Sequence, residues 1–270
     1  MVTGGNSGIG KAIALELARQ KRHVVIVCRD GGKGRAAQEE IRKATSQAVD
    51  LLIGDLGTIA GAKKLAKEIQ KKCPNLSVLI NNAGIWPTRL ELNTDGFERS
   101  FMVNHLAPFI LSRMLLGQLK KNRPARIVNL NAGLYPKGQL DIDKTPYGKD
   151  FGKIKTYMNT KLCNIYFTRK FAREIGASGV TINALHPGVI RTNLGNGDGF
   201  LGLFLRVLKV FWGSPERGAK APVWLATAPE LEKANGNYYE LTKPKEYSAN
   251  ARDEKLSETL WEFTRKATGL

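Results

Sequence analysis

Residues 3–11 read Thr-Gly-Gly-Asn-Ser-Gly-Ile-Gly-Lys and stand between a short apolar stub, Met1–Thr3, and a helical pattern over 9–20. Glycines in this spacing let the backbone turn tightly and approach a pyrophosphate, and the amino end of a helix adds free N–H groups and a positive dipole end. A glycine-rich turn alone is a weak signal. At the head of a series of alternating strands and helices, it predicts a dinucleotide-binding loop.

Apolar runs and helical patterns alternate regularly along the rest of the chain. The strand-like runs lie at 23–27, 49–53, 76–80, 125–130 and 180–185, and the helical patterns at 9–20, 34–45, 58–72, 96–119 and 153–175. Strands separated by helices need right-handed crossovers and therefore form a parallel sheet covered on both faces. We predict an α/β fold, a single-domain Rossmann-type doubly wound parallel sheet over residues 1–270, with its chemistry just beyond the carboxyl ends of the strands.

The charge balance is strongly basic. Lys and Arg number 42 against 24 Asp and Glu, which gives a net charge of +18. Such a field attracts nucleic acid, phospholipid surfaces or phosphorylated small molecules. The basic residues are scattered over helical patterns with no interleaved aromatic residues, so we expect solvated helix faces and no nucleic-acid partner. A diffuse affinity for anionic membranes is the alternative.

Cysteine usage and hydropathy bear on the compartment and on metals. The three cysteines are odd in number, far apart and without a C-x-x-C pair, which argues against a disulfide framework or a zinc site. No His/Cys/Asp cluster suggests a metal. No charged-then-apolar leader and no 18-residue apolar run occurs in the sequence. We expect a cytoplasmic protein, with peripheral attachment to a membrane surface as the alternative.

The residues after the second strand-like run bear on which dinucleotide binds. That run ends Val27-Cys28-Arg29-Asp30. An acidic residue at such a strand end bonds the ribose 2′-hydroxyl of NAD(H), whereas an arginine accommodates a 2′-phosphate and can grip it bidentately. Because Arg29 precedes any carboxylate, we predict NADP(H) rather than NAD(H). Asp30, one residue further on, is the feature that would support NAD(H).

Six motifs in order along the chain carry a resemblance to a known family. They are T-G-G-N-S-G-I-G (3–10), D-L (55–56), N-N-A-G (81–84), V-N-H (103–105), Y-M-N-T-K (157–161) and H-P-G-V-I-R-T (186–192). Together they resemble the short-chain dehydrogenase/reductase family from residue 3 to the end of the chain. C-R-D (28–30), F-M-V-N-H-L-A-P-F (101–109), S-P-E-R-G-A (214–219) and L-W-E-F-T-R-K-A-T-G (260–269) are similar to the retinol-dehydrogenase-like branch. That branch favours NADP(H) and lipophilic alcohols or carbonyls, often at membranes.

The resemblance implies roles for individual residues. Tyr157 would be the general acid/base and Lys161 its partner, bound to the nicotinamide ribose. Four residues apart on a helix, these two side chains share a face, and a phenol with an ordinary pKa of about 10 needs a cation nearby to exchange protons near neutrality. Asn104 would anchor a water that relays protons from Lys161. The implied cofactor contacts are Gly4, Asn6, Ser7, Gly8, Ile9, Gly10, Arg29, Asp55, Leu56, Asn82, Ala83, Gly84, Tyr157, Lys161, Pro187, Gly188, Val189 and Thr192.

One position departs from the family pattern. The family places a catalytic serine at the end of the fifth strand, and aligning Val128-Asn129-Leu130 puts Asn131 and Ala132 on the usual serine pair. Losing one such hydrogen-bond donor typically costs roughly 2.7–4 kcal/mol of transition-state stabilisation. Three alternatives follow: Tyr135 or Asn131 supplies another donor, the enzyme is slow, or the chain is a catalytically impaired dinucleotide-binding sensor or scaffold. The presence of Tyr157 and Lys161 favours an oxidoreductase.

Residues 199–212, G-F-L-G-L-F-L-R-V-L-K-V-F-W, form a strongly apolar segment that is too short to span a bilayer. In the family this region covers the substrate, so an apolar lid would imply a lipophilic substrate. The alternatives are an interfacial helix on a membrane, with Arg206 and Lys209 reaching the head groups, and a helix packed on the core. We therefore expect hydride transfer between NADP(H) and a retinoid-, steroid- or aliphatic-like alcohol or carbonyl, in a chain that could form a homo-oligomer.

Overall fold

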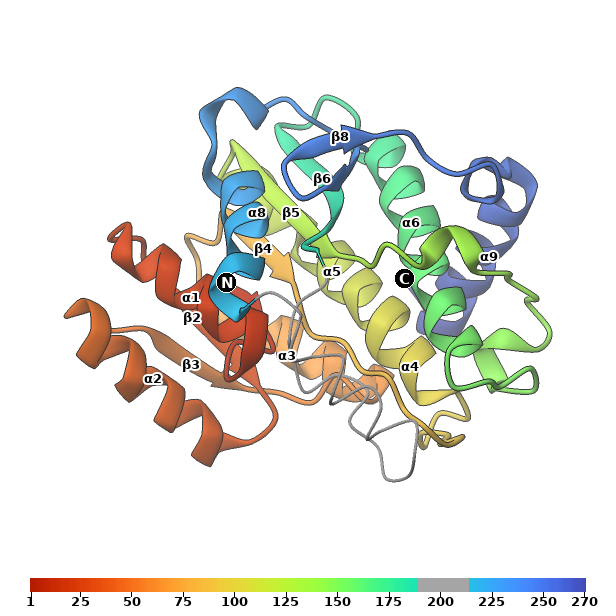
Figure 1. Ribbon diagram of the computed structural model, residues 1–270, viewed down its shortest axis with the longest axis horizontal. Coiled ribbons are helices and arrows are strands. Elements are labelled where there is room, and N and C mark those ends of the chain that lie inside the picture. Colours follow the sequence, from red (N-terminus) through yellow and green to blue (C-terminus); the bar gives the residue numbers. More distant parts are fainter. Residues whose placement is uncertain (189–213) are drawn as a thin grey trace.

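A computed structural model, which describes residues 1–188 and 214–270, contains one eight-stranded sheet (Figure 1). Its strand order is β3-β2-β1-β4-β5-β6-β7-β8, and every neighbouring pair is parallel except β7 and β8. The strands are β1 Val2–Thr3, β2 Val25–Cys28, β3 Asp50–Ile53, β4 Val78–Asn81, β5 Ala125–Leu130, β6 Val180–His186, β7 Tyr238–Glu240 and β8 Lys243–Lys245. The predicted doubly wound α/β fold is confirmed.

Helices cover both faces of this sheet. They are α1 Gly8–Arg19, α2 Gly31–Thr45, α3 Ile59–Lys72, α4 Arg99–Phe101, a π-helix over Met102–Leu106, α5 Ala107–Lys121, α6 Lys155–Ile175, α8 Pro215–Thr227 and α9 Glu254–Thr268. Buried residues of α3, α5, α6 and α9 form one apolar cluster, and those of α1, α2 and α8 form a second. Strand residues alternate between them, since Ile127 belongs to the first cluster and Val128 to the second. The sheet is therefore buried on both faces.

Several helices begin at a side-chain cap that is visible in the sequence. The carboxylate of Asp30 accepts a hydrogen bond from the backbone N–H of Lys33, Thr58 accepts one from Gly61, and Asp253 accepts one from Leu256. Each cap satisfies a backbone donor that a helix amino end otherwise leaves unpaired. These caps fix where α2, α3 and α9 start after the preceding segments.

The structure departs from the expected elements at three places. The pattern over 96–119 is divided by the π-helix, so that α5 starts only at Ala107. The strands β7 and β8 have three residues each, too few for an apolar alternation to register in the sequence. The helices α8 and α9 were recognised as family motifs and not as helices, and Pro222 inside α8 weakens its helical pattern.

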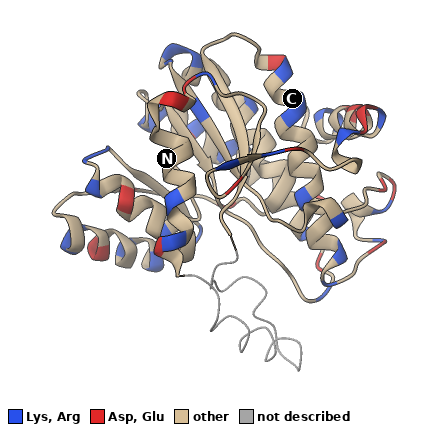
Figure 2. Ribbon diagram, turned by 45° about the horizontal axis from the view of Figure 1, so that its top comes forward, with Lys and Arg blue, Asp and Glu red and all other residues tan. Residues whose placement is uncertain are grey.

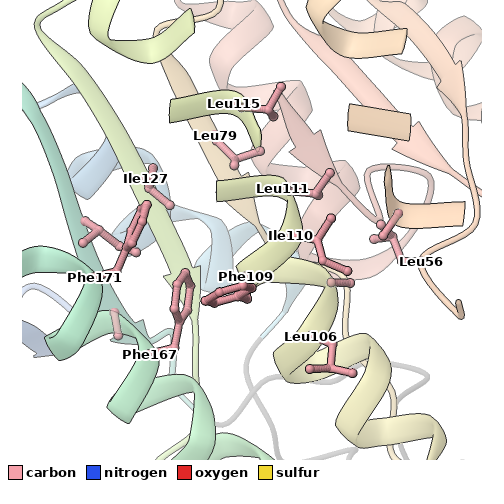
Figure 3. Packing of buried hydrophobic residues seen from close by; sticks show 14 of the residues in the cluster. Leu56, Leu79, Leu106, Phe109, Ile110, Leu111, Leu115, Ile127, Phe167 and Phe171 are labelled. Atoms are coloured by element: carbon pink, nitrogen blue, oxygen red, sulfur yellow. The ribbon is translucent and has the colours of Figure 1, made fainter. Parts of the chain in front are cut away.

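The core between α5, α6 and α9 is aromatic. The rings of Phe109 and Phe167 meet edge to face with centroids 5.6 Å apart, and Phe109 meets Trp261 in the same way at 5.3 Å. Figure 3 shows Phe109 on α5 pointing toward Phe167 on α6, with Ile127 of the sheet close by. These contacts join α5 to α6 and α9, and α6 carries the Tyr157–Lys161 pair.

The amino edge of the sheet has a cavity beside Met1. This cavity has a volume of about 480 Å³ and is lined among others by Met1, Arg22, Val78 and Arg126. Next to it, β1 pairs with β2 through Val2 and Thr3, and with β4 through Val2. The cavity lies at the opposite edge from the carboxyl ends of the strands, so it is separate from the predicted site.

Charged residues are distributed over many elements. Figure 2 shows Lys and Arg on helices on both sides of the sheet, with fewer Asp and Glu among them. Within the described residues, none of the helices has the length and apolar character needed to cross a membrane. The apolar segment 199–212, expected as a lid, an interfacial helix or a core helix, lies outside the described residues.

We expect Phe167→Ala to lower the free energy of unfolding by about 3–5 kcal/mol, because the substitution leaves a cavity at the junction of α5, α6 and β5. Leu92→Ala is the matched control, since Leu92 is 54% exposed and its truncation should change stability by less than about 0.5 kcal/mol. Chemical denaturation followed by circular dichroism measures both values. Equal losses for the two variants would contradict this account of the core.

Candidate active site

The glycine-rich loop forms a cradle in front of α1. Gly4 adopts φ +66°, which glycine tolerates without strain. A Cβ on Gly10 would lie 2.2 Å from the carbonyl oxygen of Gly4 and 2.4 Å from Nδ2 of Asn82, so only glycine fits there. Ser7 caps α1 without a side-chain hydrogen bond, which leaves the helix amino end free of competing side chains. The loop, with Asn6, Gly8 and Ile9 between these residues, fits the pyrophosphate of a dinucleotide.

The next two strands place the other predicted contacts at the same edge. Arg29 follows β2 directly and is exposed, whereas the carboxylate of Asp30 accepts the backbone N–H of Lys33 at 3.0 Å. The pKa of Asp30 lies below its ordinary value, mainly because of that hydrogen bond and further because of the nearby positive charges. After β3, the carboxylate of Asp55 accepts a hydrogen bond from the N–H of Gly57 at 2.9 Å, and Leu56 is buried. The arginine is thus the freer of the two charged groups beyond β2.

The N-N-A-G segment is tied to the glycine-rich loop. The amide of Asn82 donates to the carbonyl oxygen of Thr3 at 2.8 Å, and the N–H groups of Asn82 and Ala83 both donate to Thr3 Oγ1 at 3.0 Å. Gly84 lies beside α6, where a Cβ added to it would be 3.7 Å from Lys161 Nζ. The segment therefore joins the phosphate cradle to the Tyr157–Lys161 pair.

The first two turns of α6 carry that pair. Both side chains are buried, and Lys161 Nζ lies 5.7 Å from the centroid of the Tyr157 ring. The ammonium donates a hydrogen bond to the carbonyl oxygen of Leu130 at 3.0 Å. Burial raises the pKa of the Tyr157 phenol and lowers the pKa of Lys161 to about 8. The structure therefore brings a neutral phenol and a buried cation together at the carboxyl end of β5.

Asn104 lies in the π-helix and faces the same region. Its Oδ1 accepts the N–H of Ile85 at 2.9 Å, and its Nδ2 donates to the carbonyl oxygen of Ile85 at 3.0 Å and to Thr160 Oγ1 at 3.1 Å. Both amide donors are thus used. Asn104 fixes the backbone that follows N-N-A-G against α6, a positioning role that the sequence did not indicate.

Trp86 is a site residue that sequence reasoning missed. Its indole stacks on the ring of Tyr157, with centroids 4.7 Å apart and planes inclined by 15°. The indole N–H donates to the carbonyl oxygen of Lys153, which holds the ring from the loop before α6. The sequence signal for Trp86 is its position two residues after N-N-A-G, a motif that the family resemblance places at the cofactor.

Neither residue expected to replace the missing serine faces the site. The amide of Asn131 donates to the carbonyl oxygen of Lys161 and to Asn164 Oδ1, at 3.0 and 3.1 Å, and its oxygen accepts the N–H of Ala132 at 2.7 Å. Tyr135 is buried, and its hydroxyl accepts the N–H of Ser248 at 3.2 Å. Their side chains hold the fold together, and Ala132 itself contributes only a buried methyl group.

The end of β6 brings a histidine beside this break. His186 precedes Pro187 and Gly188, and Gly188 adopts φ +90°. A Cβ added to Gly133 would lie 3.1 Å from Cδ2 and 3.2 Å from Nε2 of the His186 ring. Val189 and Thr192, the other predicted contacts of this turn, lie outside the described residues.

The other histidines and the cysteines lie elsewhere. His105 is buried, its Nε2 lies 2.9 Å from Thr264 Oγ1, and burial lowers its pKa to about 3. All three cysteines are free. Over residues 1–188 and 214–270, no group of three His, Cys, Asp or Glu side chains could hold a metal ion.

Known proteins resemble this chain over its whole length. The family model for short chain dehydrogenases matches residues 1–142. Retinol dehydrogenase 14 of Homo sapiens is 36% identical over 288 residues, covering 100% of this chain and 86% of that protein. Retinol dehydrogenase 13 of Homo sapiens is 37% identical over 278 residues, covering 100% of this chain and 84% of that protein.

A solved structure extends the similarity to three dimensions. The crystal structure of an uncharacterized protein from Mycobacterium paratuberculosis superposes with a TM-score of 0.78 at 26% identity, covering 99% of this chain and 91% of that one. The matching fold, the cradle before α1 and the Tyr157–Lys161 pair agree with these relationships. The chain belongs to the short-chain dehydrogenase/reductase family of oxidoreductases and, within that family, is similar to the retinol dehydrogenases.

Proposed function

We propose that this chain is an NADP(H)-dependent oxidoreductase that interconverts a lipophilic alcohol and its carbonyl compound. The observation that carries the proposal is the placing of Tyr157 and Lys161 beside Gly84, at the edge of the sheet where the phosphate cradle opens. The nicotinamide, when bound, supplies or accepts the hydride. The protein contributes binding, orientation and the proton.

Tyr157 is the proton donor to the carbonyl oxygen in the reductive direction. Because burial raises its pKa, the phenol is protonated at neutral pH and can act as a general acid. Lys161 holds a positive charge 5.7 Å from that ring centroid, which favours negative charge on the phenol oxygen once the proton has left. Asn104 positions the loop that packs Trp86 on the phenol, and a water relay through its remaining acceptor sites is part of the proposal.

The substrate class follows from the surroundings of Tyr157. The half-buried indole of Trp86 covers one face of the phenol, so the approach to the proton donor is bounded by an aromatic ring. Such a wall favours flat or apolar molecules and excludes water from the proton-transfer step. The names of the related retinol dehydrogenases point to the same class. We infer a retinoid-, steroid- or aliphatic-like substrate.

The preference for NADP(H) rests on Arg29. Its guanidinium is exposed just beyond β2, where the ribose of the adenosine would lie, and can bond a 2′-phosphate bidentately. Asp30 is the residue that would favour NAD(H), and its carboxylate caps the amino end of α2. Gly4, Gly8, Gly10, Asp55 and Ala83 complete the proposed cofactor contacts on this side.

We expect Tyr157→Phe to lower kcat for carbonyl reduction by at least about 10²-fold, because it removes the proton donor and keeps the ring that stacks on Trp86. All-trans-retinal, a steroid ketone and a long-chain aldehyde form the assay panel, and Tyr147→Phe, an exposed tyrosine, is the control. NADPH affinity should be unchanged. Tight NADPH binding with no turnover on any of the three compounds would instead support the sensor or scaffold alternative.

We expect Arg29→Ala to weaken NADPH binding by roughly 10–100-fold and NADH binding hardly at all, since a charge-assisted hydrogen bond contributes about 1.5–3 kcal/mol. Arg22→Ala is the matched control, because Arg22 is exposed at the opposite end of β2. Fluorescence titration of each variant with both cofactors measures the ratio. A parallel loss for NADH and NADPH would contradict the assignment of Arg29 to the phosphate.

We expect Lys161→Met to abolish turnover and to stabilise the fold at neutral pH. The pKa of Lys161 falls from 10.5 to about 8 on folding, which corresponds to roughly 3 kcal/mol of destabilisation below pH 8. The lost bond to Leu130 offsets part of the gain. Between pH 8 and 10.5 the unfolded chain binds more protons than the folded chain, so the free energy of unfolding of the wild type rises over that window. The stability advantage of Lys161→Met over the wild type therefore becomes smaller.

Denaturant unfolding of wild type and Lys161→Met at pH 7 and pH 10 tests the sign of this effect. Lys170→Met is the control, because Lys170 lies on the same helix and pairs at the surface with Glu258. A difference between wild type and Lys161→Met that does not change with pH would mean that the buried ammonium is not the cause.

A further inference from the structure

The site as described lacks one hydrogen-bond donor for the substrate oxygen. Ala132 carries a methyl group where the family has a hydroxyl, and the polar side chains of Asn131 and Tyr135, close to it in the sequence, are hydrogen-bonded within the fold. A reacting carbonyl oxygen gains negative charge, and a donor aimed at it stabilises the transition state strongly. The neighbouring strand, β6, ends beside Ala132 in a side chain that can donate a hydrogen bond.

His186 occupies the neighbouring position on β6. Leu130 and Leu185 are paired across β5 and β6, and the N–H of Asn131 donates to the carbonyl oxygen of Leu185 at 2.7 Å. His186 therefore lies beside the break in β5. Because side chains alternate along a strand, it shares the sheet face of Ala184, which packs in the cluster with α6. That is the face on which Tyr157 and Lys161 lie.

The imidazole lies over Gly133, immediately after Ala132. A Cβ at Gly133 would be 3.2 Å from Nε2 and 3.1 Å from Cδ2, closer than side chains normally pack. Gly133 does not adopt a positive φ, so its backbone does not require glycine. The absence of a side chain at residue 133 makes room for the ring.

The ring chemistry suits a neutral donor. Burial is the main cause that lowers the pKa of His186, and the positive charge of Lys161 lowers it further, against the opposing effect of Glu240. Nδ1 is buried and has no hydrogen-bond partner among the described residues. A proton on Nδ1 would be an orphaned buried N–H, so the proton belongs on Nε2, the nitrogen beside Gly133.

We propose that the Nε2–H of His186 takes the place of the hydroxyl missing at Ala132 and donates a hydrogen bond to the carbonyl oxygen of the substrate. Tyr157 then supplies the proton, and His186 stabilises the charge that develops on the same oxygen. The inference rests on the proposed function and names a further residue of that site. It also explains why glycine follows alanine at the end of β5.

A set of five variants, with Ala132→Ser alone as the reference for the double variant, tests the proposal by kinetics. His186→Leu should lower kcat for carbonyl reduction by about 10²–10³-fold. His186→Gln places an amide N–H near the position of Nε2 and should retain kcat within about tenfold of wild type. In the Ala132→Ser background, His186→Leu should cost less than about tenfold, because the new hydroxyl supplies the donor. Tyr135→Phe should leave kcat unchanged.

Three kinetic results would overturn the proposal. The first is a loss below about threefold for His186→Leu, since one donor is worth far more. The second is an equal loss with Ala132 and with Ser at position 132, which would mark a purely structural role. The third is loss of activity in Tyr135→Phe, which would assign the donor to that phenol. NADPH affinity, measured by fluorescence, should be the same in all variants.

A measurement without turnover separates this inference from the proposed function. In ¹⁵N spectra of histidine-labelled protein, His186 should be neutral with its proton on Nε2, identified by comparison with His186→Gln. Adding β-ionone, a conjugated ketone, to the complex with NADP⁺ forms no product and should shift that signal. If the wild type reduced no carbonyl compound but the signal shifted, the hydrogen bond from His186 would be supported and the proposed oxidoreductase activity would be rejected. No shift would overturn the donor.

Discussion

Thr3 ties the glycine-rich loop to the N-N-A-G segment. The backbone of β1 pairs with β4 at Val2 and Ile80, and the N–H of Ile80 donates to the carbonyl oxygen of Met1 at 2.9 Å. Thr3 Oγ1 accepts the N–H groups of Asn82 and Ala83, and the amide of Asn82 returns a bond to the Thr3 carbonyl oxygen. These bonds join the two strands between which the strand order reverses. The phosphate cradle and the N-N-A-G segment therefore keep their spacing through side-chain contacts.

The second constraint is a buried polar network around α6, the helix of Tyr157 and Lys161. Asn129 links Asn81 of β4 to Thr168 of α6, and two residues on, Asn131 links β5 to the first turns of the same helix. Each of these bonds is buried, and only Asn81 Oδ1 among the network's described amide oxygens has no hydrogen-bond partner. Buried hydrogen bonds of this kind favour one arrangement of the packed elements. Lys161 is held at the end of this network with a depressed pKa. Burial of the Lys161 ammonium lowers the free energy of unfolding. The asparagine hydrogen bonds and the aromatic core beside them raise it.

The fold was predictable because its signals are local and repeated. Alternating apolar runs and the glycine-rich turn each depend on a few neighbouring residues. The roles of Tyr157 and Lys161 were implied by the family resemblance, and one helical turn places the two side chains near each other. Trp86 and His186 were not, because their roles depend on which strands lie side by side, and alternation along the sequence does not give the distance from a ring to Tyr157 or Gly133.

The change at Ala132 differs from the decay of an unused site. Decay would relax the neighbouring positions as well, yet each neighbour is specified by a contact. Asn131 bonds two groups of α6 and the N–H of Ala132, Gly133 lies under the His186 ring, and Tyr135 packs edge to face on Tyr238 at 4.9 Å. A segment this well determined keeps the end of β5 rigid beside Lys161. If the hydrogen-bond donor lies on β6, at His186, the end of β5 needs to be rigid but needs no hydroxyl. The methyl group of Ala132 in a well-packed segment meets that requirement.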